Sequence, residues 1–398
     1  MRILVFSELF YPHGGGAELA TWLYSKLLVE EGFKVVIVTR QFPGEPSVEA
    51  FGEGLTVYRL SLDFMFASRY FTLANAGALA TSFVSNLVKQ SDIIYVPCGW
   101  YSIIPIAKSH NKPVIVHLHN YSIVCPTSLM YDFVEQKVGS SSRRSYVLHE
   151  IVERKRGSLS VVASLMMNEC IGKFYNKIGM LSDVLIFVSK AQRDLVLSEA
   201  PSLREKSYVI HNPIPDTPLI TAESGGIGYF GGKDFVKGLH ILVQALKSLG
   251  PSNGVKAYLA MTSKGYVTVK LSNGATVNLL PRVNLAGIMR QLSIVVVPSL
   301  CPEPSPYTLI ESMLYAKLII ASNIGGIPEI LDGTTSGAIL TQPGDYSQIA
   351  NGLDFFLSLT LEEANELGIA NREHILQKFE NKQTIASFIN VLDKVGAH

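Results

Sequence analysis

Cysteine is scarce in this 398-residue chain, and so is charge. The four cysteines (Cys98, Cys125, Cys170 and Cys301) are widely spaced and form no Cys-x-x-Cys pair. This spacing excludes a disulfide framework and a cysteine zinc site, and it favours a reducing compartment. Charged residues make up 17% of the chain and the net charge is +1, so nothing attracts the protein as a whole to nucleic acid.

Long uninterrupted hydrophobic runs are lacking too. The apolar run before Glu8 is too short for a signal peptide. Residues 70–88 carry no charge and could span a bilayer, but polar residues interrupt them: Thr72, Asn75, Thr81, Ser82, Ser85 and Asn86. We therefore expect a buried helix there and a cytoplasmic protein.

Recognisable metal-binding patterns are also missing. The chain contains no Asp-x-Asp motif, and its carboxylates and histidines lack ligand spacing. We expect neither a metal ion nor another cofactor. The length suits two ordinary α/β domains.

What the chain does contain is an informative stretch from Ile294 to Glu311. Ile294 to Val297 predict a buried parallel strand, and a loop rich in proline and serine follows it. Ser305 and Pro306 predict a helix start, with the serine as cap and the proline at the first position. Glu303 then lies on the loop, and Glu311 lies in the second turn of the helix.

Open α/β sheets bind ligands at this position, beyond the carboxyl end of a strand, where the amides of a helix start receive phosphate. Two carboxylates beside such an anion site suit a ligand that is phosphorylated and rich in hydroxyls, such as a nucleotide sugar. The alternative is that Glu303 and Glu311 are ordinary solvated side chains.

The first half of the chain alternates strands and helices, which predicts a doubly wound parallel sheet. The predicted strands are Arg2–Phe6, Lys34–Thr39, Thr56–Leu60, Asp92–Val96, Pro113–Leu118 and Val184–Ser189. A loop with Gly14, Gly15 and Gly16 precedes a helix over 17–31. It is either a flexible turn or a place where backbone amides approach a ligand.

Two histidines share one face at the end of the strand at residues 113–118, because alternate strand residues point the same way. His117 and His119 could form a metal pair, but no third ligand is evident nearby. The alternative for both is a hydrogen-bonded core histidine.

A polar and basic segment covers residues 138–157, with Arg143, Arg144, Arg154, Lys155 and Arg156. It is either a solvated loop and helix face or a patch for anionic lipid or a lipid-diphosphate acceptor. The short apolar run from 159 to 167 suits a helix at a membrane surface, and equally a core helix.

The second half repeats the α/β pattern after a proline-containing connection that begins at Pro213. A strand over 226–230 leads into Gly231-Gly232-Lys233, and Lys237-Gly238 precedes a helix. A lysine at this turn would neutralise a departing diphosphate.

Several of these motifs together resemble the retaining glycosyltransferases of family 4 (group 1), which have the GT-B fold. Glu303 and Glu311 match the E-x7-E signature, and the segment 324–329 (IGGIPE) matches the turn after the next strand. The resemblance implies two Rossmann-like domains facing each other across a cleft. Residues 1–212 would bind the acceptor, 213–380 would bind the donor, and a final helix over 381–395 would pack back onto the first domain.

The resemblance also implies a reaction: a sugar moves, with retention, from a nucleotide-diphosphate sugar to a hydroxyl of a glycan, lipid-linked or small-molecule acceptor. Its implied catalytic residues are Glu303, His119 and Lys237, and the leaving phosphate would help to deprotonate the acceptor. The loop with Gly14, Gly15 and Gly16 would face donor phosphates and acceptor. The implied donor-binding residues are Glu311, Lys233, Gly232, Ser305, Pro306, Tyr307, Thr308 and Leu309.

The chain departs from the family pattern at two places. Gly232 replaces an arginine that is common in the phosphate turn, and Lys233 cannot reproduce its bidentate fork. Residues 304–306 (PSP) replace a glycine-containing segment near the sugar. Two other functions stay open: a non-catalytic nucleotide-sugar-binding subunit, and another GT-B reaction such as sugar-nucleotide epimerisation or phosphorolysis.

Overall fold

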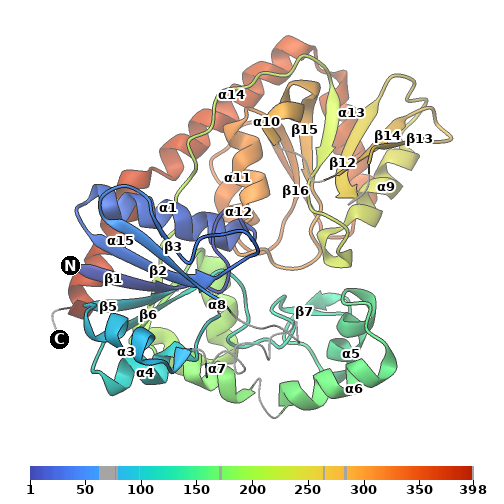
Figure 1. Cartoon of the computed structure of the whole chain (residues 1–398). Coiled ribbons are helices and arrows are strands. Elements are labelled where there is room, and N and C mark those ends of the chain that lie inside the picture. The colour runs from blue at the N-terminus through green and yellow to red at the C-terminus, as the bar shows by residue number, and fades with distance from the viewer. Residues whose placement is uncertain are drawn as a thin grey trace. The chain divides into compact units, whose positions relative to one another are not determined.

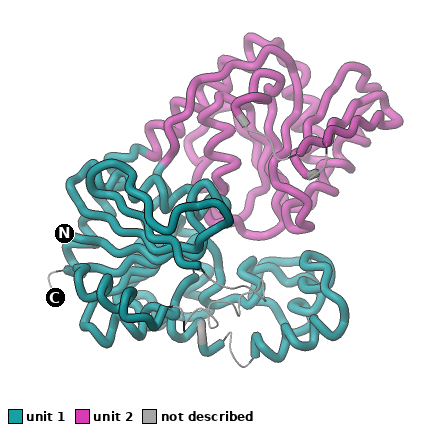
Figure 2. Tube along the Cα trace, viewed as in Figure 1, with its two compact units in different colours: residues 1–213, 380–398 teal, residues 214–379 magenta. Residues whose placement is uncertain are grey.

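Two units make up the chain in the computed structural model, which describes residues 1–61, 77, 79–97, 99–169, 173–262, 265–281 and 285–396. Unit 1 comprises Met1–Pro213 and Glu380–His398, and unit 2 comprises Ile214–Phe379 (Figure 2). The first crossing between the units follows Pro213, one residue after the boundary expected from the sequence.

Unit 1 is built on an eight-stranded sheet with parallel pairing except at one edge (Figure 1). Its strands in spatial order are β10 (Ser207–Val209), β9 (Val184–Phe187), β6 (Val114–Leu118), β5 (Ile93–Val96), β1 (Arg2–Phe6), β2 (Lys34–Arg40), β4 (Leu55–Leu60) and β3 (Val48–Ala50). Only β3 is antiparallel to its neighbour, and the sequence did not predict it. A small hairpin, β7 (Tyr131–Asp132) and β8 (Lys137–Val138), stands apart from this sheet.

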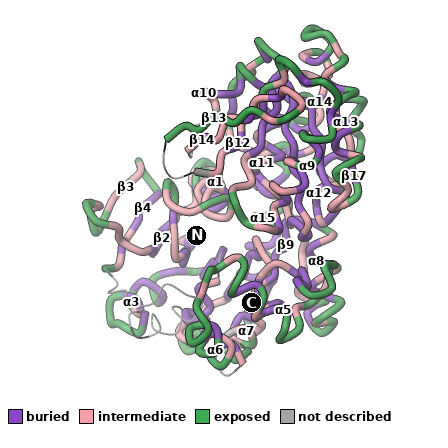
Figure 3. The backbone as a smooth tube through the Cα atoms, turned by 90° about the vertical axis from the view of Figure 1, so that its right-hand side faces the viewer, coloured by how far each residue is buried: buried purple, intermediate pink, exposed green. Residues whose placement is uncertain are grey.

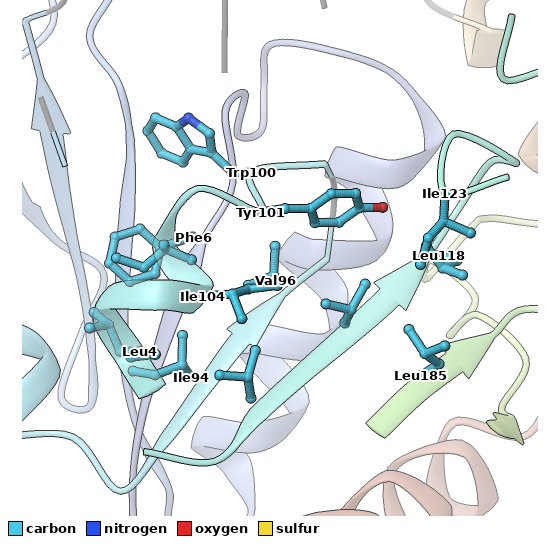
Figure 4. Close-up of a cluster of buried hydrophobic side chains, with 14 of the residues drawn as sticks. Leu4, Phe6, Ile94, Val96, Trp100, Tyr101, Ile104, Leu118, Ile123 and Leu185 are labelled. Carbon is cyan, nitrogen blue, oxygen red and sulfur yellow. The ribbon is translucent and has the colours of Figure 1, made fainter. Parts of the chain in front are cut away.

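Helices cover both faces of this sheet, as a doubly wound fold requires. Even-numbered residues of β1 such as Phe6 join the core under α3 and α4 (Figure 4). Odd-numbered residues such as Val5 join the core under α1 and α15. The helices of unit 1 are α1 (Gly16–Glu30), α3 (Ser82–Lys89), α4 (Ile103–Ser109), α5 (Arg143–Val152), α6 (Ser158–Met167), α7 (Lys173–Gly179), α8 (Lys190–Glu199), η2 (Pro201–Lys206) and α15 (Asn381–Gly396).

Unit 2 repeats the architecture around a seven-stranded sheet. Its strands in spatial order are β13 (Val267–Lys270), β14 (Thr276–Pro281), β12 (Lys256–Thr262), β11 (Gly226–Tyr229), β15 (Leu292–Val297), β16 (Leu318–Ser322) and β17 (Ala338–Thr341). Only β13 is antiparallel to its neighbour. The helices are η3 (Phe235–Lys237), α9 (Leu239–Ser248), α10 (Leu285–Ile288), η4 (Met289–Gln291), α11 (Tyr307–Leu314), α12 (Ile327–Leu331), α13 (Tyr346–Ser358) and α14 (Leu361–Lys378).

Within the described residues, no helix combines the length and the hydropathy needed to cross a bilayer. The uncharged segment 70–88 lies partly outside them, and its described end forms most of α3. There Val84, Leu87 and Val88 are buried, as expected of a core helix. Cys125 and Cys301 are buried free thiols, and the other two cysteines lie outside the described residues.

Candidate active site

Glu303 lies on the loop beyond β15 and is 8% exposed. Its Oε1 atom accepts hydrogen bonds from Lys237 Nζ at 2.5 Å and from Ser299 Oγ at 2.9 Å. Its other oxygen, Oε2, has no hydrogen-bond partner in the described part of the chain. One oxygen is therefore fixed by the protein and the other is available to a ligand.

The turn before α12 contacts the backbone of Glu303 and holds it in place. Gly326 donates its amide hydrogen to the carbonyl oxygen of Glu303 at 2.7 Å. Gly325 has a φ of +60°, and a Cβ atom there would overlap the same carbonyl oxygen. The two glycines at 325 and 326 thus set the position of the candidate catalytic carboxylate.

Lys237 comes from η3, on the turn between β11 and α9. Gly238 follows it with a φ of +74°, and a Cβ atom there would overlap the carbonyl oxygen of Pro298. This close approach brings the turn against the end of β15, where Glu303 begins its loop. Tyr229, which the sequence did not single out, donates its hydroxyl hydrogen to the carbonyl oxygens of Gly232 at 2.9 Å and Lys237 at 3.4 Å.

Electrostatics keep Lys237 charged. Burial alone would lower the pKa of its ammonium group, but the Glu303 carboxylate outweighs burial and raises that pKa above its ordinary value. The pair as a whole carries no net charge. Lys233, the second predicted lysine, is exposed and makes no ion pair with the described residues.

The start of α11 differs from the prediction. Pro306 occupies the cap position, with no side-chain hydrogen bond, and the first helical residue is Tyr307. Ser305 therefore precedes the cap, and its buried Oγ has no hydrogen-bond partner in the described chain. Leu309 donates its amide hydrogen back to Pro306, so it does not offer that hydrogen to a phosphate. Of the predicted phosphate-binding amides, that of Thr308 is unpaired within the described chain.

Glu311 lies in the second turn of α11, as predicted. It is partly buried, and its carboxyl group makes no hydrogen bond or ion pair with the described residues. Burial raises the pKa of its carboxyl group to about 7. A partly buried carboxyl without a partner is unfavourable in the free protein, and hydroxyl groups of a ligand would satisfy it.

In unit 1, His117 and His119 do lie together, with ring centroids 4.6 Å apart. His117 Nδ1 is 2.8 Å from the hydroxyl of Tyr95, which makes it a hydrogen-bonded core histidine. Burial lowers the pKa of His119 to about 4. Burial and the neighbouring His119 lower the pKa of His117 well below its ordinary value. Both rings are therefore neutral at pH 7. The Nε2 atom of His119 is buried and has no partner in the described chain.

Gln192 is a positioning residue that the sequence gave no reason to choose. This fully buried side chain of α8 donates hydrogen bonds to the carbonyl oxygens of Leu118 at 2.9 Å and Asn120 at 3.1 Å. Those two residues flank His119. A glutamine in the first turn of an amphipathic helix carries no sequence signal for such a role.

The glycine-rich loop before α1 is also different from the prediction. The helix start does not offer all its amides to an anion, because Glu18 accepts the amide hydrogen of Gly15 at 2.7 Å. Glu8 lies close enough to Glu18 for the two to interact: burial raises the pKa of Glu8, Arg40 opposes the rise, and Glu18 adds to it. Glu18, which lies beside Gly14, suits hydroxyl groups better than phosphate.

No cluster of three or more potential metal ligands occurs among the residues that the structure describes. His117 and His119 accordingly have no third ligand there.

Comparisons with known proteins identify the family of the chain. The family model described as Glycosyltransferase Family 4 matches residues 14–217, and the model described as Glycosyl transferases group 1 matches residues 225–358. The chain belongs to glycosyltransferase family 4.

Relatives of this family 4 chain are distant in sequence. An uncharacterized 42.6 kDa protein of the cps region of Klebsiella pneumoniae is 23% identical over 346 residues, which cover 83% of this chain and 87% of that protein. An alpha-maltose-1-phosphate synthase of Mycolicibacterium smegmatis is 23% identical over 250 residues, which cover 54% of this chain and 64% of that protein.

Solved structures resemble the chain over its whole length. Sucrose-phosphate synthase from Thermosynechococcus elongatus has a TM-score of 0.69 at 16% identity, covering 100% of this chain and 99% of that one. Anabaena HepE in complex with UDP and glucose has a TM-score of 0.67 at 18% identity, covering 99% of both chains. These likenesses show the GT-B fold, and the chain is a glycosyltransferase of that type.

Proposed function

We propose that this glycosyltransferase moves a sugar from a nucleotide-diphosphate sugar to an acceptor hydroxyl with retention of configuration. The observation that carries the proposal is the group at the end of β15, where Glu303 is fixed by Lys237, Ser299 and the glycine turn. HepE, which has the same fold, was solved with UDP-glucose, which supports a sugar nucleotide as the donor.

The proposed step breaks the bond between the anomeric carbon and the diphosphate oxygen. The acceptor oxygen forms the new bond on the same face, and its proton passes to the departing phosphate. Lys237 would turn from Glu303 toward the diphosphate as negative charge develops there. Glu303 Oε2 would accept hydrogen bonds from hydroxyls of the sugar.

The other residues that bind the nucleotide sugar would contact parts of it that do not react. Glu311 would accept two hydrogen bonds from the ribose hydroxyls, because a carboxylate can accept both at once. The Thr308 amide and the Ser305 hydroxyl would donate to phosphate oxygens, and the exposed Lys233 would add a second positive charge. Each of these groups lacks a partner in the described chain, so binding would satisfy it.

The acceptor side would be formed by unit 1. Neutral His119 can donate or accept one hydrogen bond through Nε2, and Glu8 and Glu18 near the glycine-rich loop suit hydroxyl groups. The acceptor would be a glycan, a lipid-linked sugar or a small molecule. We place the protein in the cytoplasm, where nucleotide sugars are the donors for such reactions.

The test is a screen of nucleotide sugars, beginning with UDP-glucose, for a rise in melting temperature and for donor consumption with added acceptors. A donor that both stabilises the protein and is consumed supports transfer. Stabilisation without consumption by any acceptor would mean a non-catalytic binding subunit. Conversion of the donor without an acceptor would mean epimerisation.

We also expect transfer to need no divalent metal, since Lys237, the helix amides and Lys233 would meet the charge of the diphosphate. Activity measured after treatment with a chelator should equal the untreated rate. Loss of turnover that magnesium or manganese restores would contradict this expectation.

A further inference from the structure

The helical hairpin formed by α5 and α6 buries several polar side chains and exposes most of its large apolar ones. Polar contacts join the two helices. Tyr146 and Ser164 share a hydrogen bond of 2.8 Å between their hydroxyls, and Ser164 also donates to Glu150 Oε2 at 2.8 Å. Arg156 completes the group with an ion pair to Glu150 at 2.9 Å. A hairpin that faces only water normally buries its apolar side chains and exposes its polar ones.

The outward faces carry the large apolar side chains instead. On α5, Leu148, Ile151 and Val152 are 38%, 49% and 46% exposed and lie at i, i+3 and i+4, on one side of the helix. On α6, Leu159, Val162 and Met166 are 87%, 56% and 64% exposed at i, i+3 and i+7. In Figure 3 the exposed residues of α5 and α6 are coloured green. The hairpin therefore presents two apolar stripes.

Basic side chains border these stripes. Arg144 lies one turn before Leu148 on the same side of α5, and Arg154 and Lys155 lie in the connection to α6. All three are exposed, and none forms an ion pair within the described chain. Arg143 is paired with Glu169, and Arg156 with Glu150. Positive charge therefore remains unpaired where the apolar side chains are exposed.

We propose that the α5–α6 hairpin is a docking surface for an anionic lipid bilayer, with its apolar side chains in the interfacial region and its basic residues at the headgroups. An apolar face bordered by arginine and lysine is the pattern that binds such surfaces. A second copy of the chain is a poorer occupant, because a two-fold contact would place the same unpaired cations against each other. The inference deepens the proposed function by selecting a lipid-linked acceptor, and it rests on that function only for the acceptor.

The test is co-sedimentation of the full chain with vesicles of phosphatidylcholine, alone or mixed with phosphatidylglycerol, at low salt. We expect strong binding only to the mixed vesicles. The triple variant Arg144→Gln, Arg154→Gln, Lys155→Gln should bind about a hundredfold more weakly, since each basic residue near an anionic surface contributes about a factor of five. The triple variant Leu159→Ser, Val162→Ser, Met166→Ser should bind at least tenfold more weakly.

A matched control replaces three exposed apolar residues of unit 2 by serine: Leu219, Tyr266 and Phe355. It should bind vesicles like the parent. Equal sedimentation of the parent with both kinds of vesicle, or equal binding by parent and hairpin variants, would overturn the proposal. So would a parent dimer, seen by light scattering, that only the hairpin serine variant dissociates.

A separate measurement tests the proposed function independently of the docking surface. UDP as a probe should raise the melting temperature of parent and hairpin variants alike. Vesicle binding without a shift by UDP or by any nucleotide sugar of the screen would leave the docking surface standing and remove the donor assignment.

Discussion

At the scale of single residues, the polar groups of the site differ in whether they have hydrogen-bond or ion-pair partners within the protein. The side chains of Glu303 and Lys237 form an ion pair at 2.5 Å, whereas the carboxyl group of Glu311 has no hydrogen bond or ion pair in the described chain. The Glu303–Lys237 ion pair can respond to the charge that develops during the reaction. Glu311 is unsatisfied until a ligand binds. The two glutamates of one motif should therefore respond differently to substitution.

We predict that Glu303→Gln lowers kcat about a hundredfold and leaves the donor KM nearly unchanged, because its contacts gain strength as the sugar leaves. Glu311→Gln should instead raise the donor KM about tenfold to a hundredfold, because contacts to the ribose are alike in ground and transition states. Steady-state kinetics on both variants, with circular dichroism to check folding, measure the difference. Parent-like kinetics for both folded variants would remove the main support for the site.

A second prediction concerns pH. Glu311 has a pKa of about 7 in the folded chain against an ordinary 4.5, so between these values the folded state holds a proton that the unfolded state has lost. Raising the pH through this window therefore reduces stability. Without ligand, Glu311→Gln should be more stable than the parent by about 1–3 kcal/mol at pH 8 and similar to it below pH 4.5.

Urea unfolding at the two pH values tests this prediction. A constant difference between parent and variant would contradict it. The donor should in turn bind the parent more tightly as the pH rises through 7, because only the ionised carboxyl accepts two hydrogen bonds.

At the scale of elements, much of the site could be predicted from the sequence because strand and helix patterns are local. The apolar run of β15 and the helix from Tyr307 were predicted, and with them the positions of Glu303 and Glu311. The cap at Ser305 was predicted wrongly, since proline at 306 takes the cap position itself. The contacts of Gln192 could not be predicted, because they join α8 to the end of β6, which only the fold brings together. The contacts of Tyr229 are local, but they depend on the exact path of the turn after β11, which no residue pattern specifies.

The turn before α12 gives a prediction at this scale. Gly325→Ala should lower stability by more than 2 kcal/mol, because the added Cβ atom overlaps the backbone of Glu303 in addition to the strain of a positive φ. Gly52→Ala is the matched control, with a φ of +71° and no atom within 4 Å of its added Cβ. It should lose only about 1–2 kcal/mol. Equal losses in chemical denaturation would show that the contact with Glu303 has no effect.

At the scale of the whole molecule, the chain leaves unit 1 after Pro213 and returns to it at Glu380. The returning helix α15 contributes core residues to unit 1 and contacts α1 (Figure 1). Phe388 is fully buried, with its ring 5.0 Å from that of Tyr24 and 5.2 Å from that of Tyr95. Each unit thus has a core of its own.

We predict two thermal transitions, and we expect UDP to raise only that of unit 2. Phe388→Ala should destabilise unit 1 by about 3–5 kcal/mol and leave the transition of unit 2 in place. Phe355→Ala, at a 49% exposed position of α13, is the control and should move neither. Differential scanning calorimetry measures both transitions. A single transition that Phe388→Ala shifts as a whole would contradict separate cores.

The return of α15 to unit 1 also has a consequence for synthesis on the ribosome. Unit 2 has all of its residues once Phe379 has emerged, whereas unit 1 still lacks the helix that covers His117 and Tyr95. The half of the protein that is translated first is therefore completed last. Until then it exposes an apolar sheet face, which makes the nascent first half a natural substrate for a holding chaperone.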